Sequence, residues 1–265
     1  MASSHAQQVD VFVMPSAVLR SGHGVNWLSF VGIAEQMKAA EYRSADDATL
    51  YAAQQTLMRA MAASALGVRP TAAADIPVDR SCRVCRNSSE HGKPLIAGVN
   101  LSMSRTTGMV AGALTSGDMT EDGAARLGAD IERLRGNFLD GFDRVALTEA
   151  ETTAVEALDR ETAQLLRLLL WTGKEAVLKA TGHGLVAGPD AVEFSPQDFP
   201  RDPAAVAGFS TRGVLTLAGQ EAQEFWVGWQ VQGEYFIAVA LDRPLELKLH
   251  PVTTPLEVKR IIEAS

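Results

Sequence analysis

The spacing of apolar and polar residues predicts the order of secondary structure in the first half of the chain. A short apolar run at residues 9–15 is suited to an opening strand. Over residues 46–66 the apolar positions recur at spacings of three, four and seven, which indicates a helix that Gly67 ends. Three strand-like segments follow, at residues 95–102, 108–114 and 127–132. The first half therefore reads as helix, loop and strands.

The second half repeats this plan. Thr148 with Glu151 three residues later predicts a capping box at a helix start. A longer helix is predicted over residues 161–180, ending at Thr181-Gly182. The alternating runs at 225–231 and 235–241 then pair naturally as a hairpin.

This repeated plan favours an α+β fold of two similar halves packed side by side. No repeat of the sequence itself accompanies it. We expect the division to fall near residue 140, giving an N-terminal subdomain over residues 1–140 and a C-terminal subdomain over residues 141–265.

Composition narrows the class of protein. The chain has 265 residues, of which 46% are hydrophobic, enough to bury a sizeable core. Its formal net charge of −8 argues against general affinity for nucleic acid or an anionic membrane. The first ten residues lack the pattern of a signal peptide, and the apolar runs are too short to span a bilayer. We expect a cytoplasmic protein.

Two cysteines form the motif Cys82-x-x-Cys85 in a loop-like stretch. His91 would supply a third zinc ligand, but no fourth is evident. Zinc binding and a pair of loop thiols both remain open.

Two acidic residues close the predicted strand over residues 127–132. Side chains two apart share a face of a strand, so Asp130 and Glu132 point one way while Ala129 and Ile131 point the other. Paired carboxylates on rigid backbone are oxygen ligands suited to Mg²⁺, although such pairs are also common at solvated strand ends.

The predicted helix at residues 161–180 carries a second charged set. Glu175 and Lys179 stand four residues apart, as in an ordinary surface salt bridge, and Lys174 is predicted to share their face. Gly173 inside the helix indicates that something approaches the backbone closely there.

Four segments in order, residues 92–94, 100–104, 128–132 and 171–179, resemble the phosphopantetheinyl transferases of the surfactin-synthetase-activating type. The resemblance runs from about residue 38 to residue 241. It implies a pseudo-twofold pair of α+β subdomains, with coenzyme A and Mg²⁺ or Mn²⁺ bound between them. It also implies a monomer that transfers 4′-phosphopantetheine to a serine of an apo acyl or peptidyl carrier protein, as in polyketide or nonribosomal peptide biosynthesis.

The resemblance also implies roles for residues at matching positions. The metal-binding carboxylates would be Asp130, Glu132 and Glu175, and the partners of the pyrophosphate would be Lys174 and Lys179. Lys93 and Pro94 would form the segment beside the adenine and 3′-phosphate, and Ser102 would fall in the loop that touches that phosphate. Glu175, or a metal-bound water, is the candidate for the base, and Lys179 would steady the leaving phosphate.

One position departs from the family pattern. Met103 stands where the family usually has a histidine that binds the 3′-phosphate, and a thioether cannot replace that hydrogen bond. Either Arg43, Arg105 or Lys38 compensates, or the 3′-phosphate is held less tightly.

Two other functions stay open at this point. A metal-dependent phosphodiester hydrolase would use the same carboxylates with water as nucleophile, and a degenerate member would bind a carrier protein or a coenzyme A thioester without transfer. A serine hydrolase is rejected, because no nucleophile elbow surrounds Ser102 or Ser104.

The surface that docks the carrier is also open. It would lie at residues 114–126 or at residues 133–146, where Arg133 and Arg135 are basic.

Overall fold

A computed structural model of the chain describes residues 6–19, 30–81, 92–115, 126–134 and 138–263. The elements that come before residue 126 are β1 (Gln7–Pro15), η1 (Ser16–Leu19), α1 (Ile33–Ala40), α2 (Ala45–Leu66), η3 (Pro70–Asp75), β2 (Asn100–Thr106) and β3 (Met109–Thr115).

The elements after residue 126 begin with a strand and three helices: β4 (Leu127–Arg133), α3 (Phe142–Ala146), α4 (Glu149–Glu156) and α5 (Arg160–Thr181). Short turns and strands follow: η4 (Gly184–Ala187), η5 (Pro189–Ala191), β5 (Val192–Phe194), η6 (Pro196–Asp198), η7 (Pro203–Ala205), β6 (Ser210–Leu215), β7 (Gln223–Gln232) and β8 (Tyr235–Leu241). The chain then forms β9 (Leu245–Pro251) and α6 (Pro255–Glu263).

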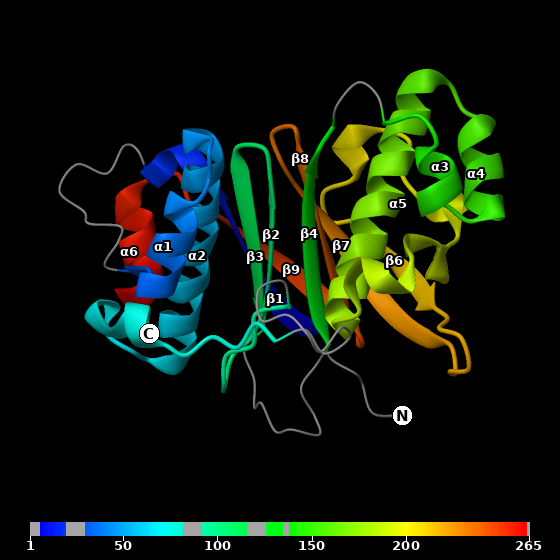
Figure 1. Cartoon of the computed structure of the whole chain (residues 1–265). Coiled ribbons are helices and arrows are strands. Elements are labelled where there is room, and N and C mark those ends of the chain that lie inside the picture. The colour runs from blue at the N-terminus through cyan, green and yellow to red at the C-terminus, as the bar shows by residue number, and fades with distance from the viewer. Residues whose placement is uncertain (1–5, 20–29, 82–91, 116–125, 135–137, 264–265) are drawn as a thin grey trace.

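The strands form two sheets that lie between two groups of helices (Figure 1). The first sheet has the order β2-β3-β1-β9, and helices α1, α2 and α6 gather on its side of the molecule. The second has the order β4-β8-β7-β6-β5, with α3, α4 and α5 on its side. The prediction of an α+β fold with two halves is confirmed.

The two sheets do not follow the predicted division after residue 140. Strand β4 lies before that point but pairs with β8 in the second sheet. Strand β9 lies after it but runs parallel to β1 in the first sheet, and α6 packs against α2. The sheets therefore do not divide at residue 140, and the division into two domains stays a prediction.

An apolar layer joins the sheets. Three residues of β4, Leu127, Ala129 and Ile131, are fully buried together with apolar residues of β1, β3 and β8. The predicted alternation along β4 is confirmed, since the residues between them point to the opposite face, towards α5. This arrangement brings the acidic face of β4 beside the helix that carries Glu175.

Most predicted elements are present, with shifted bounds. The helix at residues 46–66 is α2, with Ser44 as N-cap and Gly67 in the left-handed C-cap conformation. The capping box of Thr148 and Glu151 is confirmed at the start of α4. The strand expected at residues 95–102 begins only at Asn100, since residues 95–99 form isolated bridges instead of a ladder.

A buried ion pair ties α4, α5 and β5 together. The Lys174 amine and the Glu151 carboxylate lie 2.6 Å apart, and both side chains are fully buried. Lys174 also donates to the backbone oxygen of Val192, and the second oxygen of Glu151 accepts from the backbone N–H of Phe194. Burial lowers the pKa of Lys174, while the charge and hydrogen bond of Glu151 act to raise it. Because both side chains are fully buried, solvent cannot take the place of either partner if the other is removed.

We expect Lys174→Ala to lower the free energy of unfolding by about 3–5 kcal/mol, because it leaves a buried carboxylate without its cation. Denaturant titration followed by circular dichroism measures this loss. The double variant Lys174→Met with Glu151→Gln should recover part of it. As a matched control, Arg212→Ala breaks the exposed pair of Arg212 with Glu224 and should cost less than about 1 kcal/mol. Equal effects of Lys174→Ala and Arg212→Ala would contradict the prediction.

Candidate functional site

A row of hydroxyl groups joins the two sheets at their neighbouring edges. The Ser102 hydroxyl accepts from the backbone N–H of Ala129 at 2.9 Å. The Ser104 hydroxyl donates to Asp130 Oδ1 at 2.7 Å, and the Thr106 hydroxyl donates to Glu132 Oε2 at 2.8 Å. The partners follow the same order along both strands, so β2 and β4 run in the same direction. Each carboxylate of β4 is thus held by a hydroxyl of β2.

Gly128 sets the distance between β4 and α5. A Cβ atom at this position would lie 1.9 Å from the Ala176 carbonyl oxygen and 2.4 Å from the Ala180 nitrogen. No real side chain fits at such separations, so only glycine lets the strand approach the helix backbone this closely. This approach brings Asp130 within reach of Lys179.

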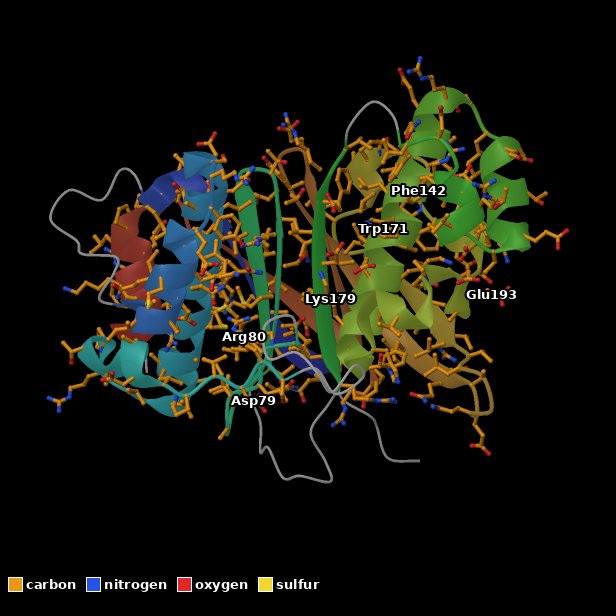
Figure 2. The ribbon with its side chains drawn as sticks, in the orientation of Figure 1. Asp79, Arg80, Phe142, Trp171, Lys179 and Glu193 are labelled. Carbon is orange, nitrogen blue, oxygen red and sulfur yellow. The ribbon has the colours of Figure 1, made fainter. Side chains whose placement is uncertain are left out.

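Lys179 pairs with the carboxylate of the neighbouring strand. Its amine lies 2.6 Å from Asp130 Oδ1 and 2.9 Å from the Ser104 hydroxyl. Figure 2 shows Lys179 on α5 at the side facing the other half of the molecule. The simple reading of Glu175 and Lys179 as a surface salt bridge is therefore wrong, because Glu175 is only 8% exposed and no ion pair joins them among the described residues.

Burial and neighbouring charges change the acidity of two carboxyl groups. Burial, with the nearby charge of Asp130, raises the pKa of Glu175 from 4.5 to about 7, and Lys179 opposes this shift. Burial also raises the pKa of Glu132, where the hydrogen bond from Thr106 opposes the shift. The mutual repulsion shows that the three carboxyl groups share one electrostatic environment.

Two carboxylate oxygens here are buried without a hydrogen-bond partner, namely Asp130 Oδ2 and Glu175 Oε1. A buried, unsatisfied acceptor is costly, and a cation would satisfy both. The residues therefore fit a divalent metal chemically. In the described part of the chain, however, no three acidic, histidine or cysteine side chains are already close enough to hold one, since Asp130 is turned to Lys179.

A pocket of about 460 Å³ opens next to Glu175 and Lys179. Its lining comes from both halves of the molecule: Gln54, Gln55, Met58, Arg80, Gly92, Lys93, Pro94, Ser102, Met103, Glu175, Lys179, Gly182, His183, Gly184 and Val186. The structure thus brings together six residues that the sequence proposed for the site, which are Lys93, Pro94, Ser102, Met103, Glu175 and Lys179. The Lys93 amine also donates to the Leu127 carbonyl at 2.6 Å. Ser102 lies in strand β2, whereas the resemblance implied a loop at this position.

Two of the proposed coenzyme A contacts lie elsewhere. The structure contradicts the expected pyrophosphate role of Lys174, because its amine is buried against Glu151 on the far side of α5. Adjacent helix positions differ by about 100°, so Lys174 and Glu175 face different surroundings. Arg43 is exposed after α1 and does not line the pocket.

The close approach predicted at Gly173 is confirmed, and it is a matter of packing. A Cβ there would lie 2.8 Å from the Trp229 ring and 2.9 Å from the Phe194 ring. Gly173 therefore makes room for core aromatics, and its place in the motif carries no direct information about a ligand.

Sequence reasoning missed the hydroxyl partners and two basic residues of the pocket. Ser104 and Thr106 could have been found from their spacing, which repeats the two-residue spacing of Asp130 and Glu132. Arg80 carried no signal, and His183 follows the end of the helix without a pattern that would assign it to the pocket.

Some predictions fall outside the described residues. These are Cys82, Cys85 and His91 of the possible zinc site, Arg135, and most of the docking segment at 114–126. Among the helices that the structure describes, none combines the length and apolar character needed to span a bilayer.

The raised pKa of Glu175 predicts a pH-dependent stability. The folded state holds this proton more tightly than the unfolded state, so acid favours folding through this group, and its contribution is lost as the pH rises through about 7. With metal removed by chelation, the free energy of unfolding of Glu175→Gln should rise relative to that of the unmodified protein as the pH increases from about 5 to about 8. The relative increase should be roughly 3 kcal/mol at most. Urea titration at both pH values measures the gain. The exposed carboxylate control Glu246→Gln should show none, and a gain shared by both variants would refute the assignment.

Comparison with known proteins assigns this part of the chain. A sequence model described as the 4′-phosphopantetheinyl transferase superfamily matches residues 126–240. This stretch runs from β4 almost to the end of β8 and contains Asp130, Glu132, Glu175 and Lys179. No significant match was found among curated proteins. Residues 126–240 therefore form a domain of the 4′-phosphopantetheinyl transferase superfamily.

Proposed function

We propose that this protein transfers 4′-phosphopantetheine from coenzyme A to a serine of an apo carrier protein, releasing adenosine 3′,5′-bisphosphate. The observation that carries the proposal is the group of three carboxylates with two unsatisfied buried oxygens, placed beside a pocket that both halves line. The superfamily match over the same strand and helix supports the transfer chemistry.

Asp130, Glu132 and Glu175 would hold a Mg²⁺ or Mn²⁺ ion. Such an ion supplies charge neutralisation at the pyrophosphate oxygens. Asp130 would have to exchange its contact with Lys179 for the metal, which frees the lysine amine to turn towards the pocket that it lines.

Lys179 would act on the leaving group. The phosphorus–oxygen bond to adenosine 3′,5′-bisphosphate breaks as the new bond to the serine oxygen forms, and negative charge collects on the departing phosphate. A lysine amine beside that oxygen stabilises the charge, which is the main requirement in phosphoryl transfer.

The nucleophile would be the serine hydroxyl of the carrier. Its proton needs an acceptor within hydrogen-bonding reach when the carrier is bound. Glu175 is therefore our candidate for the base. It lines the pocket, and its Oε1 has no other partner among the described residues.

The chain also favours the larger, surfactin-synthetase-activating type of the superfamily. The matched domain accounts for the second half only, and the first half supplies a second sheet with its own helices. We propose that the protein works as a cytoplasmic monomer in a polyketide, nonribosomal peptide or fatty acid pathway. Its net charge of −8 means that an acidic carrier must dock on a local basic patch.

Intact-mass spectrometry tests the transfer. An apo carrier incubated with the protein, coenzyme A and Mg²⁺ should gain one phosphopantetheine group. Glu175→Gln and Lys179→Ala should each slow this gain by about 10²–10³-fold, because each removes a charge that the transition state requires. The surface variants Glu246→Gln and Lys248→Ala, which change exposed residues outside the pocket, should keep the rate.

The outcomes separate the alternatives. Release of adenosine 3′,5′-bisphosphate without a modified carrier would indicate a hydrolase. Binding of coenzyme A without either product, across acyl and peptidyl carriers, would indicate a protein that binds without transfer.

The segment at residues 133–146 is our proposed docking surface for the carrier. Arg133 is the last residue of β4, directly after Glu132, and forms an ion pair with Glu234 at 2.5 Å. Arg133→Glu should raise the KM for the carrier several-fold and leave the KM for coenzyme A unchanged. Glu234→Gln breaks the same ion pair without reversing the charge and serves as the control. An unchanged KM for the carrier in Arg133→Glu would remove this surface from consideration.

A further inference from the structure

The wall of the pocket away from the carboxylates carries Arg80. Its Nη2 donates to Gln55 Oε1 at 2.5 Å and contacts Met58 Sδ at 3.6 Å. Both partners are neutral, and no carboxylate of the described residues pairs with this guanidinium. The half-buried charge of Arg80 therefore remains available to an anion in the pocket.

The position of Arg80 is fixed from two sides. Gln55 is 1% exposed on α2, so its amide cannot easily move. The Arg80 carbonyl accepts from the Gly92 N–H at 3.1 Å, and a Cβ on Gly92 would lie 2.4 Å from that carbonyl oxygen. Gly92 thus packs directly on the Arg80 backbone, and Arg80, Lys93 and Pro94 line the same pocket.

His183, which follows the C-terminus of α5, lines the same pocket. Its Nδ1 is buried and has no hydrogen-bond partner among the described residues. A buried N–H without an acceptor is rarer than a buried lone pair without a donor. In the tautomer that leaves Nδ1 unprotonated, Nε2 carries an N–H that can donate a hydrogen bond.

Met103 cannot contribute such a hydrogen bond. It is 8% exposed and packs in the apolar core of the first half, on the face of β2 that lies against α2. The pocket therefore has a thioether at position 103, and its basic residues come from other elements: Arg80, Lys93, Lys179 and His183.

We propose that Arg80, with His183, binds the 3′-phosphate of coenzyme A in this protein, in place of the residue at position 103. The inference rests on the proposed function for the identity of the ligand. A phosphate monoester carries up to two negative charges and matches the planar donor geometry of arginine. Lys179 lies on the other side of the pocket, towards the carboxylates, so the two ends of the bisphosphate have separate cations.

Among the other basic residues near this region, Lys93 lines the pocket but donates to the Leu127 carbonyl, and three more do not line it. The Arg105 guanidinium lies 5.4 Å from the centroid of the Tyr51 ring and donates to the Tyr42 hydroxyl. Lys38 pairs with Glu41 at 2.9 Å. Neither lines the pocket, and the same is true of Arg43.

Calorimetric binding of adenosine 3′,5′-bisphosphate and of 5′-AMP, to the protein without carrier, tests the assignment. The unmodified protein should prefer the bisphosphate. Arg80→Gln should reduce this preference by about 10- to 100-fold, the value of one or two charge-assisted hydrogen bonds. His183→Ala should reduce it less, and the affinity for 5′-AMP should stay nearly constant in both.

Control variants make the test specific. Arg69→Gln removes an exposed arginine of the same half and should not change the preference. Arg80→Lys keeps the positive charge and should retain part of the preference for the bisphosphate. Thermal unfolding of each variant identifies any loss that comes from misfolding. A preference that survives in Arg80→Gln, or is lost instead in Arg43→Gln or Arg105→Gln, would overturn the proposal.

The result is independent of the transfer assay. If no carrier is modified but the preference depends on Arg80, the binding site stands and the proposed function fails. If transfer occurs and Arg80→Gln still prefers the bisphosphate, the proposed function stands and this inference fails.

Discussion

The contact between β2 and β4 is the interaction on which the site depends. These strands belong to different sheets, and three side-chain hydroxyls join them, one at each second residue of β2. Because two of these hydrogen bonds end on Asp130 and Glu132, contacts that hold the sheets together also orient the carboxylates. A stable scaffold and a functional geometry therefore come from one set of atoms.

The helix that completes the site is held against β4 by packing on both of its sides. On one side Gly128 admits the helix backbone, and on the other Gly173 admits the rings of Trp229 and Phe194. The buried pair of Lys174 and Glu151 adds an electrostatic restraint on rotation of the helix. The placement of the helix consequently turns Glu175 and Lys179 towards the pocket, and Lys179 is also held by Asp130 and Ser104.

The sequence predicted the parts of the fold and site that depend on local pattern. The helix α2, the hairpin of β7 and β8, and the capping box at Thr148 follow from periodicity and turn chemistry, and the face shared by Asp130 and Glu132 follows from strand alternation. The orientation of Lys174 could not be predicted, because it depends on a carboxylate 23 residues away that only the fold brings near. The same holds for Arg80, whose place depends on the burial of Gln55, and for β4, whose partner β8 comes about a hundred residues later.

The chain path has a mechanical consequence. Because β9 and α6 return to the first sheet, the unit from β4 to β8 is inserted between β3 and β9, and the chain crosses from one half to the other twice. The return crossing, between Leu241 and Leu245, has only three residues and reaches about 14 Å when fully extended. Near that crossing the Gln230 side chain donates to the Leu247 carbonyl, and Gly228 packs against Leu245. The second half is thus tied to the first by a three-residue connection, which limits how far the two halves can separate at this end.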